Sequence, residues 1–188
     1  MSNKFVVIEG SDGAGKSTLC AKVSDALPYR LVKTPTQDYL QRRAFFDESG
    51  RNPLSRFFFY CAGVHESSAE IKALLEHENV VADRYLQSLQ IYHEVLTGRD
   101  LSHVINELDV VNPEVTIILY ADPEIVLKRI KERNSILATD KHLEFDRRFM
   151  TAVIERMKDV PIIPGLLKLD TSYLNAREVF EECLPHLR

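Results

Sequence analysis

One segment near the N-terminus constrains the fold more than any other. The apolar run at residues 5–9 leads directly into the glycine-rich sequence GSDGAGKS at residues 10–17, and a helical pattern begins at Lys16. Glycines let such a loop turn tightly and present successive backbone N–H groups to a phosphate, while the helix adds the positive end of its dipole. This strand, loop and helix form a complete Walker A pattern, which predicts a nucleoside triphosphate site.

The residues of this loop have separate expected roles. We expect Lys16 to lie against the β- and γ-phosphate oxygens and Ser17 to supply a hydroxyl ligand to Mg²⁺. A glycine-rich turn with a solvated lysine is the alternative, but it does not explain why lysine and serine follow the third glycine. ATP and Mg²⁺ are therefore the predicted cofactors. The residues predicted to bind ATP are Gly10, Ser11, Asp12, Gly13, Ala14, Gly15, Lys16, Ser17 and Thr18.

Apolar runs and helical segments alternate along the chain. Short runs rich in β-branched residues predict strands at residues 5–9, 29–33, 79–83, 115–121 and 166–170. Helical periodicity predicts helices at residues 16–26, 56–76, 86–96, 124–133 and 143–158. The strands lack polar alternation, which indicates that helices cover both faces of a parallel sheet. We predict an α/β fold of the P-loop NTPase type, with a five-stranded parallel sheet in three αβα layers.

Length, charge and cysteine content limit the classes of protein that fit. A chain of 188 residues suits one domain, which we place at residues 1–188. The net charge is −4 and the basic residues are scattered, so we expect no nucleic acid polymer and no membrane as partner. The three cysteines are odd in number and far apart, which favours a reducing, cytoplasmic location. A small-molecule nucleotide is the expected substrate.

The third predicted strand ends in an acid followed by an arginine. The sequence VVADRY brings Asp83 to the carboxyl edge of a buried strand, where ligands of open parallel sheets bind. Asp83 would help to position Mg²⁺, and Arg84 could bind an anionic group through its rigid fork of donors. The alternative is a surface pair of opposite charges after a strand. The position at the sheet edge favours the functional interpretation.

A polar segment with no strand signal follows the fourth predicted helix, and we predict a lid at about residues 134–142. Lys128, Arg129, Lys131 and Arg133 precede it. Phosphoryl transfer spreads negative charge over the equatorial oxygens, so cations that close on the transition state would stabilise it. The alternative is a solvated helix face with favourable cations at a helix C-terminus.

Several segments together resemble thymidylate kinases. They are residues 8–18 (IEGSDGAGKST), the Asp83-Arg84-Tyr85 turn with Ser88 and Tyr92, residues 127–133, Asp140, Glu144, and residues 169–171 (LDT). The resemblance covers nearly the whole chain. It implies transfer of the γ-phosphoryl group of ATP to dTMP or a related deoxynucleoside monophosphate, and it suggests a homodimer.

The resemblance also implies roles for individual residues on the acceptor side. By matching position, Asp12 would hydrogen-bond the 3′-hydroxyl of the acceptor, Arg84 would hold its phosphate, and Phe58 would stack on its base. Tyr92 would crowd the 2′ position and so favour a deoxyribose.

The catalytic arginines follow from the same resemblance. No arginine lies between Gly10 and Gly15, which resembles the subgroup that supplies its catalytic arginine from the lid. Arg129 and Arg133 would be those donors, and Lys16 and Arg84 complete the predicted catalytic set.

The chain departs from the family pattern on the acceptor side. Ala62 stands four residues after Phe58, where the family usually has an arginine, and His93 replaces the usual glutamine after Tyr92. Residues 33–36 read KTPT where the family has an Arg-Glu-Pro-Gly-like turn. Two alternatives stay open at this point. One is a deoxynucleoside kinase, whose hydroxyl acceptor needs a carboxylate base such as Glu9 or Asp83. The other is a nucleotide-dependent binding switch without catalysis.

Overall fold

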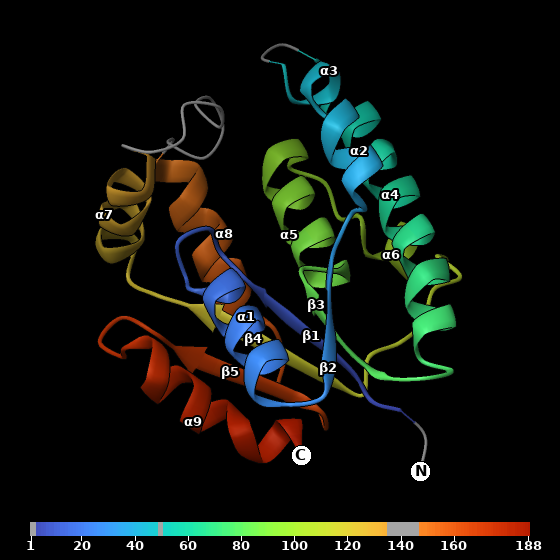
Figure 1. Ribbon diagram of the computed structural model, residues 1–188. Helices are drawn as coiled ribbons and strands as arrows, with labels where there is room; N and C mark the ends of the chain where they lie inside the picture. The colour runs from blue at the N-terminus through green and yellow to red at the C-terminus, as the bar shows by residue number, and fades with distance from the viewer. Residues whose placement is uncertain (1–2, 49–50, 135–146) are drawn as a thin grey trace.

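A five-stranded parallel sheet forms the centre of the protein, with strand order β2-β3-β1-β4-β5 (Figure 1). A computed structural model describes residues 3–48, 51–134 and 147–188. The strands are β1 (Phe5–Gly10), β2 (Tyr29–Lys33), β3 (Asn79–Asp83), β4 (Val115–Tyr120) and β5 (Leu166–Asp170). Each lies within one residue of its predicted bounds, and the predicted α/β fold of the P-loop NTPase type is confirmed.

Helices cover both faces of the sheet, as the apolar strands predicted. Val6 and Ile8 of β1 pack on one face with residues of α1 (Lys16–Ala26) and α9 (Ala176–Leu187). Phe5 and Val7 point to the other face and pack against α4 (Pro53–Leu74) and α5 (Leu86–Thr97). Every residue of β1 is buried, which explains why residues 5–8 of this strand are continuously apolar.

The remaining described helices are α2 (Gln37–Arg42), α3 (Ala44–Asp47), α6 (Ser102–Asn106), α7 (Pro123–Asn134) and α8 (Arg147–Asp159). The five helices predicted from periodicity do not include α2, α3, α6 or α9. Helix α6 is too short for a periodic signal, and α9 contains Pro185, although a capping box of Asn175 and Glu178 marks its start. Helix α4 begins earlier than predicted because the Asn52 side chain accepts hydrogen bonds from the N–H groups of Leu54 and Ser55.

The predicted lid at 134–142 falls largely outside the described residues, which resume at Arg147. No helix in the described ranges is both long enough and apolar enough to cross a membrane.

Backbone contact between β1 and β4 explains the first glycine of the loop. Gly10 ends β1 with a φ of 143°, and a Cβ atom there would lie 2.0 Å from the carbonyl oxygen of Leu119 on β4. Only glycine fits this close approach. The loop after β1 therefore leaves the sheet at its carboxyl edge, beside the ends of β3 and β4.

A second glycine brings α2 close to α4. Gly63 lies in α4, and a Cβ atom there would lie 2.6 Å from Cβ of Pro35 and 2.9 Å from Cδ1 of Tyr39. Pro35 precedes α2 and Tyr39 belongs to it. The absence of a side chain at position 63 thus allows the segment after β2 to lie directly against α4.

We predict that Gly63→Ala destabilises the protein by about 1–3 kcal/mol, because the rigid Pro35 ring cannot move aside. Alanine alone would favour the helix by about 1 kcal/mol, so a net loss isolates the steric conflict. Thermal unfolding measures the effect, with Ala62→Ser on the exposed side of the same helix as the control. An unchanged or raised Tm would contradict the close packing of α2 on α4.

Candidate active site

A cleft of about 1000 Å³ runs along the carboxyl edge of the sheet. We call its two halves the P-loop end and the α3–α4 end. The P-loop end is lined by residues 12–19, Arg129, Thr171, Leu174, Ala176 and Val179. The α3–α4 end is lined by the turn after β2 and by Arg43, Asp47, Arg56, Tyr60, Val64 and His93. Arg84 and Tyr92 also line the cleft.

Lys16 is buried at the P-loop end, with only 6% of its surface exposed. Its Nζ donates to the carbonyl oxygen of Ser11 at 2.8 Å and lies 3.9 Å from Oδ1 of Asp12. Burial, followed by the nearby charge of Arg84, lowers the pKa of Lys16 to about 8. The protein therefore does not fully compensate the loss of water around the Lys16 ammonium group. An anionic ligand would stabilise this charge.

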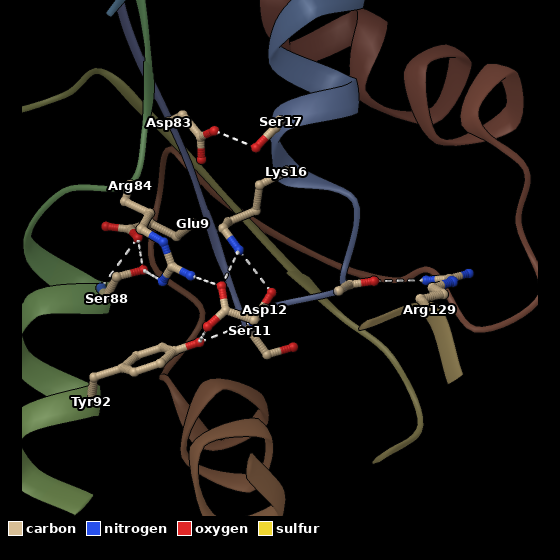
Figure 2. Close-up of polar contacts among 11 residues, drawn as sticks. Glu9, Ser11, Asp12, Lys16, Ser17, Asp83, Arg84, Ser88, Tyr92 and Arg129 are labelled. Carbon is tan, nitrogen blue, oxygen red and sulfur yellow. Dashed lines mark hydrogen bonds and ion pairs between the residues drawn. The ribbon is translucent and has the colours of Figure 1, made fainter. Parts of the chain in front are cut away.

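Ser17 and Asp83 meet across the start of α1 and the end of β3. The hydroxyl of Ser17 donates to Oδ2 of Asp83 at 2.6 Å (Figure 2). A hydroxyl and a carboxylate are the hard oxygen ligands that Mg²⁺ accepts, with waters and phosphate oxygens completing its octahedron. The residue types at this point fit the predicted metal.

Arg84, Asp12 and Tyr92 form a second polar cluster (Figure 2). Nη2 of Arg84 is paired with Oδ1 of Asp12. The phenol of Tyr92 donates to Oδ2 of Asp12 at 3.0 Å and accepts from its backbone N–H at 2.9 Å. Arg84 adopts a left-handed backbone conformation, with a φ of 73°. Such conformations in residues other than glycine often occur at functional sites.

The charge states in this cluster follow from burial and pairing. Burial opposes the charge of Arg84, but Asp12, Tyr92 and Asp83 together outweigh it and raise the pKa of Arg84 well above its ordinary value. Burial, with the Asp12 charge, raises the pKa of Tyr92, which therefore stays a neutral donor. The cleft holds a permanent cation beside the P-loop.

Glu9 binds the N-terminus of α5, the helix that carries Tyr92. Its carboxylate is buried and accepts the backbone N–H groups of Gln87 at 3.0 Å and Ser88 at 3.2 Å. The Ser88 hydroxyl also donates to it and accepts from Nη1 of Arg84 at 3.3 Å. Burial raises the pKa of Glu9. Glu9 therefore caps the N-terminus of α5 and does not line the cleft.

Arg129 supports the P-loop from the side opposite Arg84 (Figure 2). Its guanidinium donates to the carbonyl oxygen of Thr171 at 2.7 Å and to that of Gly13 at 3.3 Å. Thr171, which follows β5, donates to the carbonyl oxygen of Ala14 at 2.9 Å. The resemblance implied that Arg129 is a catalytic donor. In the structure its guanidinium lines the cleft and donates a hydrogen bond to the P-loop backbone. The side chain of Arg133 and residues 135–146 lie outside the described part of the chain.

The structure does not bring Phe58 to the cleft. Its side chain is 56% exposed, and it is not among the residues that line the cavity. Arg56, Tyr60 and Val64 line the cleft instead, spaced by one helical turn each. Phe58 lies half a turn away from this face. The sequence of four consecutive aromatic residues at 57–60 hides the phase of the helix, which is why the prediction chose the wrong ring.

Ala62, where the resemblance implied an arginine, is exposed and does not line the cleft. Val64, four positions after Tyr60, lines the cleft and is only 3% exposed. Arg43 and Arg56 supply cations to this end of the cleft, and the sequence did not predict them or Asp47 and Tyr60 as site residues.

Gly10 and Ser11 were also predicted to bind ATP, and neither lines the cleft. Ser11 is fully buried, and its carbonyl oxygen orients Lys16. Of the residues predicted from the sequence, Asp12, Lys16, Ser17, Asp83, Arg84 and Tyr92 all lie together around the P-loop.

A family model described as thymidylate kinase matches residues 8–164. The chain is 31% identical to the thymidylate kinase of Mycoplasmoides gallisepticum, with 90% of each chain covered. It is 28% identical to a probable thymidylate kinase of Methanococcus vannielii, with 96% of this chain and 93% of that protein covered.

Two solved structures share the fold. Thymidylate kinase from Candida albicans matches with a TM-score of 0.79 and 20% identity, covering 98% of this chain and 90% of that one. Deoxyadenosine kinase from M. mycoides with bound dATP matches with a TM-score of 0.76 and 19% identity, covering 98% and 99%. At these identities the likeness concerns the fold alone.

We predict that Lys16→Met abolishes ATP binding and yet raises the Tm of the ligand-free protein by a few degrees at pH 7. The folded-state pKa of Lys16, about 8, lies below the ordinary value of 10.5, so the unfolded chain binds more protons between these values. The charged lysine thus costs stability below about pH 8, and this cost disappears as the pH rises toward 10.5.

Differential scanning fluorimetry from pH 7 to 10.5 measures the Tm difference, which should shrink across this range. Lys22→Met on the same helix is the control. A lower Tm for Lys16→Met at pH 7 would show that the lysine charge is stabilising in its site.

Proposed function

The chain belongs to the thymidylate kinase family, and we propose that it transfers the γ-phosphoryl group of ATP to dTMP or a related deoxynucleoside monophosphate. The products are ADP and the nucleoside diphosphate. One observation carries this proposal: one cleft extends from the P-loop to the α3–α4 end, and Arg84, which pairs with Asp12 of the P-loop, lines it.

The position of Arg84 suits an acceptor that is already anionic. Its guanidinium is held charged within the cleft, where bidentate binding of a phosphate fits its fork of donors. Nζ of Lys16 lies 3.9 Å from Oδ1 of Asp12, and Arg84 pairs with the same oxygen atom. A donor phosphate at Lys16 and an acceptor phosphate at Arg84 would thus be neighbours, as direct transfer requires.

Catalysis would depend on alignment and charge stabilisation. A monophosphate oxygen is an adequate nucleophile without a strong general base, so the P-loop N–H groups, Lys16 and Arg84 supply the main groups. Asp12 and Tyr92 would contact the acceptor sugar, Asp12 at the 3′-hydroxyl and Tyr92 beside the 2′ position. Arg129 keeps the P-loop in shape, while a direct contact of Arg133 or the lid with the phosphoryl group follows from the resemblance alone.

The deoxynucleoside kinase alternative needs a carboxylate that can take a proton from a 5′-hydroxyl. Glu9 is occupied by the N-terminus of α5, and Asp83 by Ser17 on the metal side. Glu9 does not line the cleft, and Asp83 would bind the metal, so these positions favour the monophosphate kinase. The polar groups of the α3–α4 end also favour a second substrate over a binding switch.

We also propose a Mg²⁺ site, a single kinase domain that forms a homodimer, and a cytoplasmic location. Ser17 and Asp83 would hold Mg²⁺, which would supply positive charge to the phosphates of ATP. Residues 1–188 would act as one kinase domain, with a homodimer suggested by the family. The cysteines Cys20, Cys61 and Cys183 are free and buried, in keeping with a reducing, cytoplasmic location.

We expect the purified protein to phosphorylate dTMP with ATP and Mg²⁺ and to leave thymidine unchanged. Arg84→Gln should lower kcat/KM for dTMP by about a hundredfold or more, because it removes a preorganised charge from the acceptor phosphate. Product analysis by chromatography measures both results, and Arg30→Gln at an exposed site is the control. Phosphorylation of thymidine but not dTMP would support the nucleoside kinase, and no turnover on either would support the switch.

Asp83→Asn should raise the Mg²⁺ concentration needed for half-maximal activity by about tenfold, since a neutral amide binds the cation more weakly than a carboxylate. Activity titrations with MgCl₂ at fixed ATP measure the change. Asp25→Asn, an exposed carboxylate near the end of α1, is the matched control. An unchanged Mg²⁺ dependence for Asp83→Asn would remove Asp83 from the metal site.

A further inference from the structure

The turn after β2 has no part in the proposed phosphoryl transfer, although its residues Lys33, Thr34 and Pro35 line the cleft. Thr34 is buried there, with 6% of its surface exposed. It follows directly after Lys33, which is the register partner of Asp83 on the neighbouring strand β3. The end of β2 therefore brings Thr34 beside Asp83 and Arg84, at the carboxyl edge of the sheet.

Thr34 makes hydrogen bonds to both peptide groups that flank Arg84. Its backbone N–H donates to the carbonyl oxygen of Asp83 at 3.3 Å, and its Oγ1 donates to the carbonyl oxygen of Arg84 at 2.7 Å. The backbone N–H of Arg84 donates to the carbonyl oxygen of Ile8 at 3.0 Å. Since the backbone angles of a residue describe the relative orientation of its two peptide groups, these bonds together define the conformation of Arg84.

That conformation is unfavourable for an arginine. The φ of Arg84 is 73°, in the left-handed region that side chains other than glycine rarely adopt. A residue stays in such a conformation only when its surroundings hold it there. The hydroxyl of Thr34 supplies one of these restraints, and the branch at Cβ limits the rotation of this side chain.

The backbone of Arg84 also decides where its guanidinium lies. Nη2 is paired with Asp12 of the P-loop, and Nη1 donates to Oγ of Ser88 at 3.3 Å (Figure 2). A change of φ at Arg84 redirects its side chain relative to the sheet, because Cβ moves with the backbone. The guanidinium would then move away from both contacts. Restraints on the Arg84 backbone are therefore restraints on its charge.

From these contacts we propose that Thr34 is a positioning residue for phosphoryl transfer. Its hydroxyl holds Arg84 in the left-handed conformation that places the guanidinium beside the P-loop. The inference rests on the proposed function, in which Arg84 binds the acceptor phosphate. Because a donor fixed in advance stabilises developing charge with little rearrangement, loss of this hydroxyl weakens the acceptor side of the reaction and leaves ATP binding intact.

Two substitutions of Thr34 separate its hydroxyl from its shape. Thr34→Val removes the hydroxyl and should lower kcat/KM for dTMP by about tenfold or more with KM for ATP unchanged, because a methyl group would face the carbonyl oxygen of Arg84. Thr34→Ser keeps the hydroxyl and should stay within about threefold of wild type. Thr151→Val is the matched control, since Oγ1 of Thr151 donates to the carbonyl oxygen of Arg147 at 2.8 Å on α8, outside the cleft.

A double variant distinguishes an effect through Arg84 from a direct contact between Thr34 and the substrate. In the Arg84→Gln background, Thr34→Val should lower kcat/KM by less than about twofold, because the guanidinium that Thr34 positions is absent. An equal loss in both backgrounds would show that Thr34 acts independently of Arg84 and would overturn the proposal. Equal losses for Thr34→Ser and Thr34→Val would overturn it as well, since the hydroxyl would then not be the active group.

Crystal structures of the two single variants measure φ of Arg84 independently of activity. We expect a left-handed φ in Thr34→Ser and its loss in Thr34→Val. If Thr34→Val keeps the left-handed φ or the wild-type kcat/KM, the role of Thr34 is wrong while the kinase activity stands. If the wild-type protein phosphorylates no monophosphate, the proposed function fails, and φ of Arg84 still decides whether Thr34 holds it. Thr34→Ala, which adds no methyl group, replaces Thr34→Val in each comparison if the valine variant does not fold.

Discussion

Burial of several ionisable side chains at the carboxyl ends of β1 and β3 is the constraint on which the rest of the structure depends. Glu9, Asp12, Lys16, Asp83 and Arg84 gather there, and charges removed from water must be paired or hydrogen-bonded. Asp12 is paired with Arg84 and lies near Lys16, Asp83 accepts from Ser17, and Glu9 accepts from the start of α5. Each pairing ties one element of the fold to the P-loop.

These pairings prepare the site before any ligand binds. The Glu9 cap sets the position of α5, which carries Tyr92, and Tyr92 in turn holds Asp12. Arg129 and Thr171 support the loop from the other side. Donors held in place in this way need little rearrangement when negative charge develops in the transition state. The lowered pKa of Lys16 shows that its buried charge destabilises the ligand-free protein. Phosphate oxygens would compensate this charge.

Local and repeating signals explain why so much was predictable. The strands are buried on both faces and therefore continuously apolar, and Asp83 and Arg84 follow one of them at the sheet edge. The choice of the wrong aromatic ring has its cause in helix phase. Phe58 and Tyr60 are both aromatic residues on one amphipathic helix, and no local rule says which ring faces a cleft formed by distant segments. Short α6 lacked the length that a periodic signal needs.

The sequence by itself determined the phosphate loop, the order of strands and helices along the chain, and the supply of an acid and an arginine after β3. Backbone geometry and side-chain burial within one segment are enough to specify these features. Only the tertiary structure decided the composition of the α3–α4 end, where Asp47, Arg56 and His93 come from three separate helices. Which side chains meet there depends on how those helices rotate and pack, and that is set by contacts between segments far apart in the chain.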